Sequence, residues 1–285
     1  MRFRFGGVDF GGLSSLLVTG FDPGAADVRD GDAPRPQRDG VLTGRDYLGG
    51  ATWAFDIITN TRTLGTALAA AAALEAAWKD RKVRLSPLAA VPLSYEMDGR
   101  WRRVYGRPGK FVGPTGTVRA LQGGGSVTAD FRVTNPLSFD DDLSSVTLTI
   151  VPASTGGLEA PLVAPLSTVR SSAPRAGLVV NTGDAPSPLG VTFYGPVTDP
   201  WVRAAAGWEV GLTGSLAYDQ AVTVDPLAGT VTRQDGAPAL GMLTRATRLS
   251  GTELAPGVNE LTFGGTDPTG TARAVLSWRN AHYSI

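Results

Sequence analysis

The sequence contains no cysteine and one histidine, and it has no apolar run long enough to cross a membrane. Without cysteine there are no disulfides, thiolate metal sites or thiol nucleophiles. His282 lies close to the C-terminus, so we do not expect a triad in which a carboxylate orients histidine beside a nucleophile. The apolar run at residues 64–74 is far shorter than the roughly 20 residues of a membrane span. Asp9 and several glycines interrupt the stretch after the basic N-terminus, and we therefore expect no signal peptide.

Net charge is absent as well, because 26 basic side chains balance 26 acidic ones over 285 residues. A dedicated nucleic-acid binder would usually carry a clear basic excess. The balance is uneven along the chain: residues 1–135 hold 18 basic and 13 acidic side chains, and residues 136–285 hold 8 and 13. Two halves of opposite sign indicate two units with different surroundings, and the length also favours two domains.

Catalytic and phosphate-binding motifs are missing too. The sequence has no Gly-x-x-x-x-Gly-Lys-Ser/Thr loop and no Gly-x-Ser-x-Gly elbow. The run Asp140-Asp141-Asp142 could offer oxygens to calcium, but it lacks the Gly and Glu spacing of an EF-hand. We therefore interpret it as a solvated loop. A carboxylate pair for glycoside hydrolysis stays open, although no motif marks one.

What the sequence does contain is many turn residues, 37 glycines and 20 prolines, and 42% of all residues are hydrophobic. This composition is typical of a folded, mainly β chain. In the first half we expect a strand over residues 1–8, a long loop over 22–40 and a strand over 47–58. In the second half the clearest strands are 189–194, 208–211, 221–224, 230–233 and 274–278. Short strands at such spacing favour a β-sandwich.

One helix is predicted, over residues 63–82. Ala67, Ala71, Leu74 and Trp78 follow one another at helical spacing and form a single apolar stripe. Thr63 or Thr66 can cap the start of the helix. Lys79, Arg81 and Lys82 would lie in its last turn, where the helix dipole favours cations.

A hairpin is predicted over residues 93–105, because Asp98-Gly99 suits a two-residue turn with positive φ. Tyr95, Arg100 and Arg102 would then share one face. The other face would carry Glu96, Trp101 and Arg103. Both faces mix aromatic and charged groups, which fits packing against another subunit or domain.

Two aromatic groups allow a binding interpretation beside a structural one. The basic residues around Trp101 and Tyr105 could form a nucleic-acid platform, or an exposed hairpin whose arginines stack on aromatics or pair across an interface. The basic residues are Arg100, Arg102, Arg103, Arg107 and Lys110. The zero net charge favours the hairpin. Trp201 and Trp208 could stack on a sugar ring, although such residues are more often core or interface.

An ordered series of motifs resembles the siphophage distal tail proteins. The stretch 181–188, Asn-Thr-Gly-Asp-Ala-Pro-Ser-Pro, and the stretch 191–196, Val-Thr-Phe-Tyr-Gly-Pro, look like the opening of that family's C-terminal domain. Residues 222–225 and 230–232 match its hairpin. Residues 254–261, Leu-Ala-Pro-Gly-Val-Asn-Glu-Leu, match its Leu-x-Pro-Gly-x-Asn-x-Leu box, and residues 274–281 match its closing strand. In this box Pro-Gly makes a turn and Asn259 can bond its own backbone.

The first half is similar to the same family in its Asp39-Gly40 start, in residues 103–107, Arg-Val-Tyr-Gly-Arg, and in the strand that ends at Asn135-Pro136. The family more often has Asp before that proline. The resemblance implies an N-terminal β-barrel-like ring, or belt, domain with one α-helix, followed by a C-terminal galectin-like β-sandwich. We expect these domains at residues 1–135 and 177–285, with a connecting segment at 136–176.

The resemblance also implies function. Six copies would close into a ring that continues the tail tube at the virion's tail tip, and DNA would pass through its lumen without specific binding. The implied partners are the tail tube protein, the tape-measure protein, and the tail hub and receptor-binding proteins. No active site, cofactor or membrane insertion is implied, and assembly would take place in the host cytoplasm. The alternatives are a carbohydrate-binding minor tail protein and a tail-associated polysaccharide-degrading enzyme.

For the ring interface we single out the helix stripe and the hairpin. The candidate interface residues are Ala67, Ala71, Leu74, Trp78, Trp101, Arg103 and Tyr105. A ring contact is heterologous, so one patch meets a different patch on the neighbour. Because DNA must pass without sticking, we expect the excess arginines to face protein and the lumen to be neutral or acidic.

Overall fold

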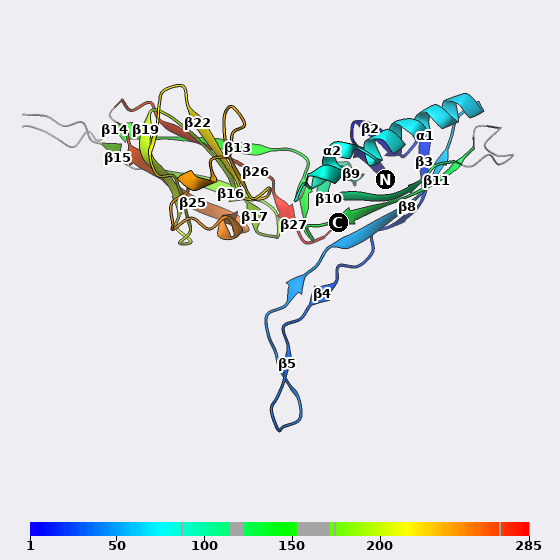
Figure 1. The fold of residues 1–285 in the computed structure, drawn as a ribbon, viewed down its shortest axis with the longest axis horizontal. Helices are drawn as coiled ribbons and strands as arrows, with labels where there is room; N and C mark the ends of the chain where they lie inside the picture. The colour runs from blue at the N-terminus through cyan, green and yellow to red at the C-terminus, as the bar shows by residue number, and fades with distance from the viewer. Residues whose placement is uncertain are drawn as a thin grey trace, which may run out of the picture. The chain divides into compact units, whose positions relative to one another are not determined.

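The computed structural model describes residues 1–86, 88–114, 122, 124–152, 172–173, 175–267 and 269–284. The chain is mainly β (Figure 1) and divides into two compact units. Unit 1 comprises residues 1–142 and 283–285, and unit 2 comprises residues 143–282. The division falls inside the stretch 136–176, which the sequence suggests as a connecting segment. About half of that stretch, residues 153–171 and 174, lies outside the described residues.

Unit 1 is built on one antiparallel sheet. Its strands run in the order β2 (Val8–Gly11), β1 (Arg2–Phe5), β9 (Val91–Met97), β10 (Arg100–Val112), β11 (Ser126–Val133), β8 (Ala51–Thr59) and β3 (Leu16–Asp22), and β12 (Ser138–Asp140) also pairs with β10. The end strands β2 and β3 are consecutive in sequence and lie against each other. Among the described residues no ladder joins them, so the sheet curls toward a barrel without closing.

The first strand is shorter than the sequence suggests. Its alternation predicts one strand over residues 1–8, but β1 ends at Phe5. Gly6 and Gly7 both have positive φ, 56° and 81°, a conformation that only glycine adopts at little cost. They turn the chain, and Val8 begins β2, which pairs with β1.

The predicted helix and its stripe are confirmed. Helix α1 (Leu64–Trp78) begins after Thr63, whose hydroxyl accepts the N–H of Thr66 at 3.3 Å. Its buried residues are the four of the stripe. Ala71, Leu74 and Trp78 pack into a core rich in aromatic side chains from the sheet, in which the Trp78 ring lies 4.8 Å from that of Phe5.

The end of this helix differs from the prediction, which extended to Lys82. Helix α1 stops at Trp78, and a second, five-residue helix, α2 (Arg81–Leu85), follows. The carboxylate of Asp80 accepts the N–H of Lys82 at 2.9 Å, so it caps a new helix start rather than continuing the old one. The basic residues 79, 81 and 82 therefore lie beyond the last turn of α1.

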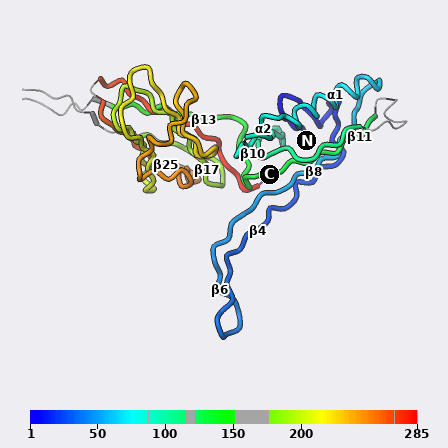
Figure 2. The backbone as a smooth tube through the Cα atoms, viewed as in Figure 1, coloured from blue at the N-terminus to red at the C-terminus, as the bar shows by residue number. Residues whose placement is uncertain are grey.

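Residues 22–40, expected to be a long loop, form half of a two-stranded arm (Figures 1 and 2). In the arm β4 (Val28–Arg29) pairs with β7 (Tyr47–Leu48), and β5 (Ala33–Pro34) pairs with β6 (Val41–Leu42). The predicted strand over 47–58 is consequently two elements, because residues 47–48 belong to the arm and β8 begins at Ala51. Residues 22–40 suggest a loop because they are polar and include the turn pairs Asp30-Gly31 and Asp39-Gly40.

Unit 2 is a sandwich of two antiparallel sheets around one apolar core. One sheet has the order β13 (Ser144–Thr149), β26 (Arg273–Trp278), β18 (Gly190–Tyr194), β22 (Ala221–Asp225) and β23 (Thr230–Arg233). The other has the order β16 (Arg175–Asn181), β25 (Gly257–Thr266), β19 (Val197–Ala204) and β20 (Glu209–Gly211), with β21 (Ser215–Leu216) paired to β19. Phe193 and Phe263, one from each sheet, approach to 6.2 Å between ring centroids.

Short elements complete unit 2. These are the strands β14 (Val151–Pro152), β15 (Ser172–Ala173), β17 (Ser187–Pro188), β24 (Glu253–Leu254) and β27 (Ala281–His282), and the 3-10 helices at Leu240–Met242 and Leu249–Gly251. The box at residues 254–261 turns as its sequence predicts. The side-chain oxygen of Asn259 accepts the N–H of Ala255 at 3.0 Å, and its nitrogen donates to the Ala255 carbonyl at 2.8 Å.

Candidate functional site

The hairpin of β9 and β10 carries the first group of candidate residues, and its predicted geometry is confirmed. Met97 pairs with Arg100, and Asp98 and Gly99 between them have φ of 51° and 74°. Trp101 pairs with Glu96, and Arg102 pairs with Tyr95. Because opposed residues share a face, Trp101 and Tyr95 point to opposite sides of the sheet, with Tyr95 buried in the core.

Trp101 lies in a stack of cations on the face opposite the core. The guanidinium groups of Arg2 and Arg4 lie 5.6 and 4.9 Å from its ring centroid, within the range of cation–π attraction. Each guanidinium also has a carboxylate partner: Arg2 donates to Glu96 at 2.6 Å and Arg4 to Asp9 at 2.7 Å. These hydrogen bonds hold the pKa of Glu96 and of Asp9 below the usual values.

Three of the other basic residues of this region, Arg102, Arg103 and Arg107, also bind within unit 1. Arg103 donates to the carboxylate of Asp141 at 2.9 Å and to its carbonyl at 3.1 Å. Arg107 donates to the carbonyls of Val83 and Ser86, both at 2.6 Å, and so fastens α2 to the sheet. Arg102 donates to the carbonyl of Ser284 at 3.3 Å. Arginines engaged in this way fit the exposed-hairpin interpretation better than a nucleic-acid platform.

The remaining interface candidates make their contacts within unit 1. The stripe of α1 is 0–2% exposed and packs on the unit's own sheet. Tyr105 is half-buried, and its ring lies 5.4 Å from that of Phe139. A subunit contact at α1 and at the hairpin stays a prediction. For the helix, the surface that a neighbour could reach is the outer face, where Leu68 is 45% exposed.

The two tryptophans proposed for sugar contact are both held in unit 2. The guanidinium of Arg203 lies 4.7 Å from the centroid of Trp201 and covers a face of that ring. Arg203 is fixed in turn by Glu209. Trp208 packs against the sandwich core, and its indole N–H donates to the carbonyl of Glu253 at 2.9 Å. A sugar would have to displace these contacts, and sugar binding here stays a prediction.

The candidates for catalysis or metal binding lie apart from one another. His282 approaches Asp184, with 3.7 Å between Nδ1 and the carboxylate. Asp141 accepts hydrogen bonds from Ser94 at 2.8 Å and from Arg103, so it links strands rather than lying in a free loop. Across the described part of the chain, no three of the histidine, aspartate and glutamate side chains form a group that could hold a metal ion.

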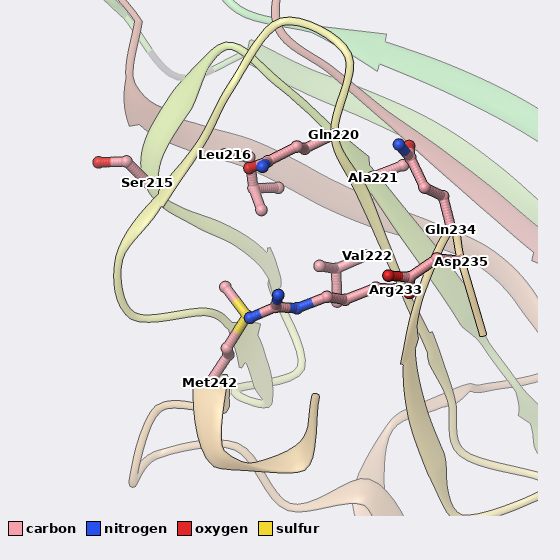
Figure 3. A pocket seen from close by; sticks show the side chains of 9 residues that line it. All are labelled: Ser215, Leu216, Gln220, Ala221, Val222, Arg233, Gln234, Asp235 and Met242. Atoms are coloured by element: carbon pink, nitrogen blue, oxygen red, sulfur yellow. The ribbon is translucent and has the colours of Figure 1, made fainter. Parts of the chain in front are cut away.

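A pocket of about 210 Å³ lies in unit 2 (Figure 3). Its lining is formed by Ser215, Leu216, Gln220, Ala221, Val222, Arg233, Gln234, Asp235 and Met242. Gln220, Arg233, Gln234 and Asp235 supply the longer polar side chains, and Asp235 is the one acidic residue among the nine. A glycosidase site needs two carboxyl groups facing each other, which this pocket does not provide.

The arm is the feature that sequence reasoning missed. The sequence of this stretch predicts a loop, because it has two Asp-Gly pairs and no clear alternation of apolar residues. The signal that could have identified it is a pair of short apolar segments, at residues 41–42 and 47–48, opposite matching segments at 28 and 33–34.

No described helix is long and apolar enough to cross a membrane.

This architecture also occurs in proteins of known structure. No protein-family model and no curated protein matches the sequence. Among solved structures, the chain is similar to the Dit protein of phage SPP1, described as a paradigm of the hub adsorption apparatus in phages that infect Gram-positive bacteria. The TM-score is 0.59 at 14% identity, over 98% of each chain.

The chain is also similar to a protein of the phage P2 baseplate in its activated conformation with calcium. That TM-score is 0.54 at 9% identity, over 93% of this chain and 91% of the other. A strontium form of that baseplate gives the same TM-score at 10% identity. The chain therefore has the fold of a Dit-like phage tail protein.

Proposed function

We propose that this protein is a structural component of a siphophage tail tip, a distal tail protein that joins the tail tube to the receptor-binding apparatus. The observation that carries the proposal is the shared fold, which extends over 98% of this chain and of the SPP1 protein. The likeness thus includes both units in the same order. The two similar proteins of known structure belong to an adsorption hub and to a baseplate. Neither description names an enzymatic activity.

In this role unit 1 forms a homohexameric ring through which DNA passes, and unit 2 is its galectin-like domain. The ring contacts the tail tube, tape-measure, hub and receptor-binding proteins. The excess arginines of unit 1 face protein, and the lumen is neutral or acidic. The ion pairs of Arg2, Arg4 and Arg103 with carboxylates of their own chain support this, because a paired arginine attracts a DNA phosphate less than a free one.

Particle mass and shape test the proposal directly. A closed ring of six 29.6 kDa chains has a mass of about 178 kDa. We expect light scattering of the purified protein to approach that mass and electron micrographs to show rings. A monodisperse 29.6 kDa monomer at high concentration, with no rings, would contradict the proposal. An arginine-lined bore in a reconstruction of the ring would contradict the proposed lumen alone.

A further inference from the structure

The pocket in unit 2 (Figure 3) has a firm apolar floor. Leu216 and Val222, which line it, are 4% and 1% exposed and belong to the core of the sandwich. Met242 packs against the same core. Its N–H donates to the Ala239 carbonyl at 2.9 Å, and its carbonyl accepts the N–H of Thr213 at 2.6 Å. The volume of about 210 Å³ equals that of about seven water molecules in the liquid, which is room for a six-membered ring with its substituents.

Arg233, at the end of β23, supplies a cation to this pocket. In Figure 3 its side chain runs along one side of the pocket. Among the residues that the structure describes, its guanidinium makes no hydrogen bond, ion pair or cation–π contact. Two other arginines of unit 2 are covered, because Arg203 lies 4.7 Å from the ring centroid of Trp201 and Arg273 lies 4.6 Å from that of Tyr194. An uncommitted guanidinium suits two oxygens of one carboxylate or phosphate group.

Gln220 supplies a second donor, from the opposite side of the pocket (Figure 3). Its side-chain oxygen accepts the N–H of Ala217 at 3.0 Å, and its own backbone N–H donates to the Ala217 carbonyl at 3.0 Å. These bonds hold the side chain in place and use its oxygen. The side-chain nitrogen, with two N–H groups, is left to donate to a ligand. The pocket therefore offers two sets of donors to one acidic group.

Asp235 adds an acceptor to the lining. One of its carboxylate oxygens accepts the N–H of Ala237 at 2.9 Å, in a turn where the N–H of Arg233 donates to the Ala237 carbonyl at 2.9 Å. A carboxylate accepts several hydrogen bonds, so Asp235 can also accept one from a ligand. A bare anion is repelled by this negative charge. A ligand that also carries hydroxyl groups can donate one of them to Asp235.

We propose that this pocket binds an acidic sugar, which is a ring with hydroxyl groups and one carboxylate or phosphate. Arg233 and Gln220 bind the acidic group, and Asp235 accepts a hydrogen bond from a hydroxyl. The C–H groups of the ring pack on the apolar floor, on Val222 and Met242. The two tryptophans considered above for sugar contact do not line this pocket. The inference goes beyond the proposed tail role and does not depend on the ring.

Matched sugars and matched variants of the full-length protein test this site. The probes are glucuronate and glucose 1-phosphate, with neutral glucose, acetate and inorganic phosphate as comparisons. Arg233→Gln removes the cation at an exposed position. Gln220→Glu keeps an oxygen for the N–H of Ala217 but replaces the donor nitrogen with a negative oxygen. Arg245→Gln is the control, because Arg245 is exposed in the same unit and does not line the pocket.

Calorimetric titration or ligand-observed NMR measures the affinities. We expect at least one acidic sugar to bind the wild type with a Kd on the order of 1 mM, as is typical of so small a ligand. Glucose, acetate and phosphate should bind at least tenfold more weakly. Arg233→Gln and Gln220→Glu should each weaken binding of the acidic sugar at least tenfold, with the Tm of the wild type, while Arg245→Gln leaves binding unchanged. The acid that binds more tightly identifies the group as carboxylate or phosphate.

Three results would overturn the site. The first is that neither acidic sugar binds. The second is that glucose, acetate or phosphate binds as tightly as the acidic sugars do. The third is that the Arg233→Gln and Gln220→Glu variants bind like the wild type. Light scattering measures the ring in a separate experiment, so failure of the sugar site and failure of the proposed ring are distinguishable.

Discussion

At the scale of single residues, unit 2 contains a buried carboxylate, that of Asp267. Asp267 is 2% exposed, and it accepts hydrogen bonds from the hydroxyl and the N–H of Thr269, at 2.6 and 2.8 Å, and from the N–H of Ala272 at 2.7 Å. Burial alone would raise the pKa of this carboxyl, but the hydrogen bonds outweigh it and the net pKa lies below its usual value. The ionised form therefore stabilises the fold.

Substitution of Asp267 tests that statement through pH. A carboxyl whose pKa is lower in the folded state stabilises above its unfolded pKa, about 4, and this stability is lost as pH falls through the folded value. Asp267→Asn removes the titration and one acceptor, so we expect the variant to be less stable at pH 7 by about 1–3 kcal/mol. The difference from the wild type should shrink toward pH 3.

Urea titrations at both pH values measure this difference. Asp219→Asn, at an exposed position, serves as the control and should follow the wild type. An Asp267→Asn variant whose deficit is the same at pH 3 and pH 7 would show that the ionised carboxylate does not carry the effect.

At the scale of elements, α1 is held by one large anchor. Trp78 is fully buried, contacts the rings of Phe5, Phe10, Phe55 and Phe131, and donates its indole N–H to the carbonyl of Asp130 at 3.0 Å. Ala residues elsewhere on the helix keep its surface slim. Trp78 is thus the largest of the buried side chains through which the helix packs on the sheet.

Removal of the anchor should therefore weaken unit 1 far more than removal of an outward side chain. We expect Trp78→Ala to lower the free energy of unfolding by about 3–5 kcal/mol, because it leaves a large cavity and an unpaired carbonyl. Leu68→Ala, on the exposed face of the same helix, should change it by no more than about 0.5 kcal/mol. Equal losses in the two variants, measured by chemical denaturation, would contradict this account of the helix.

The elements also show what the sequence could and could not predict. The stripe of α1, the Asp98-Gly99 turn and the bonding of Asn259 depend on spacing and local chemistry, and all three are confirmed. The end of α1 was missed because Asp80 suits a helix start as well as a continuing helix. The arm was missed because its strands are only two residues long and no alternation of apolar residues marks them. The stack on Trp101 was left open because Arg2 and Arg4, which lie on the Trp101 ring, are almost a hundred residues away in sequence.

At the scale of the whole molecule, the chain leaves unit 1 at residue 142 and returns to it at residue 283. The return is anchored, because the carbonyl of Ser284 accepts hydrogen bonds from Ser138 at 2.6 Å and from Arg102 at 3.3 Å. Unit 2 is thus inserted into unit 1 by connectivity, and each unit has its own apolar core. This organisation predicts separate thermal transitions.

Paired substitutions in the two units test that prediction. Asn181 is fully buried in unit 2, where it donates to the carbonyls of Ala185 and Leu254 and accepts the N–H of Gly183. Asn181→Ala would leave these buried groups unpaired, at a cost above about 2 kcal/mol. In calorimetry it should lower one transition by several degrees, and Trp78→Ala should lower the other. One transition that shifts with either variant would mean that the two units unfold as a single cooperative structure.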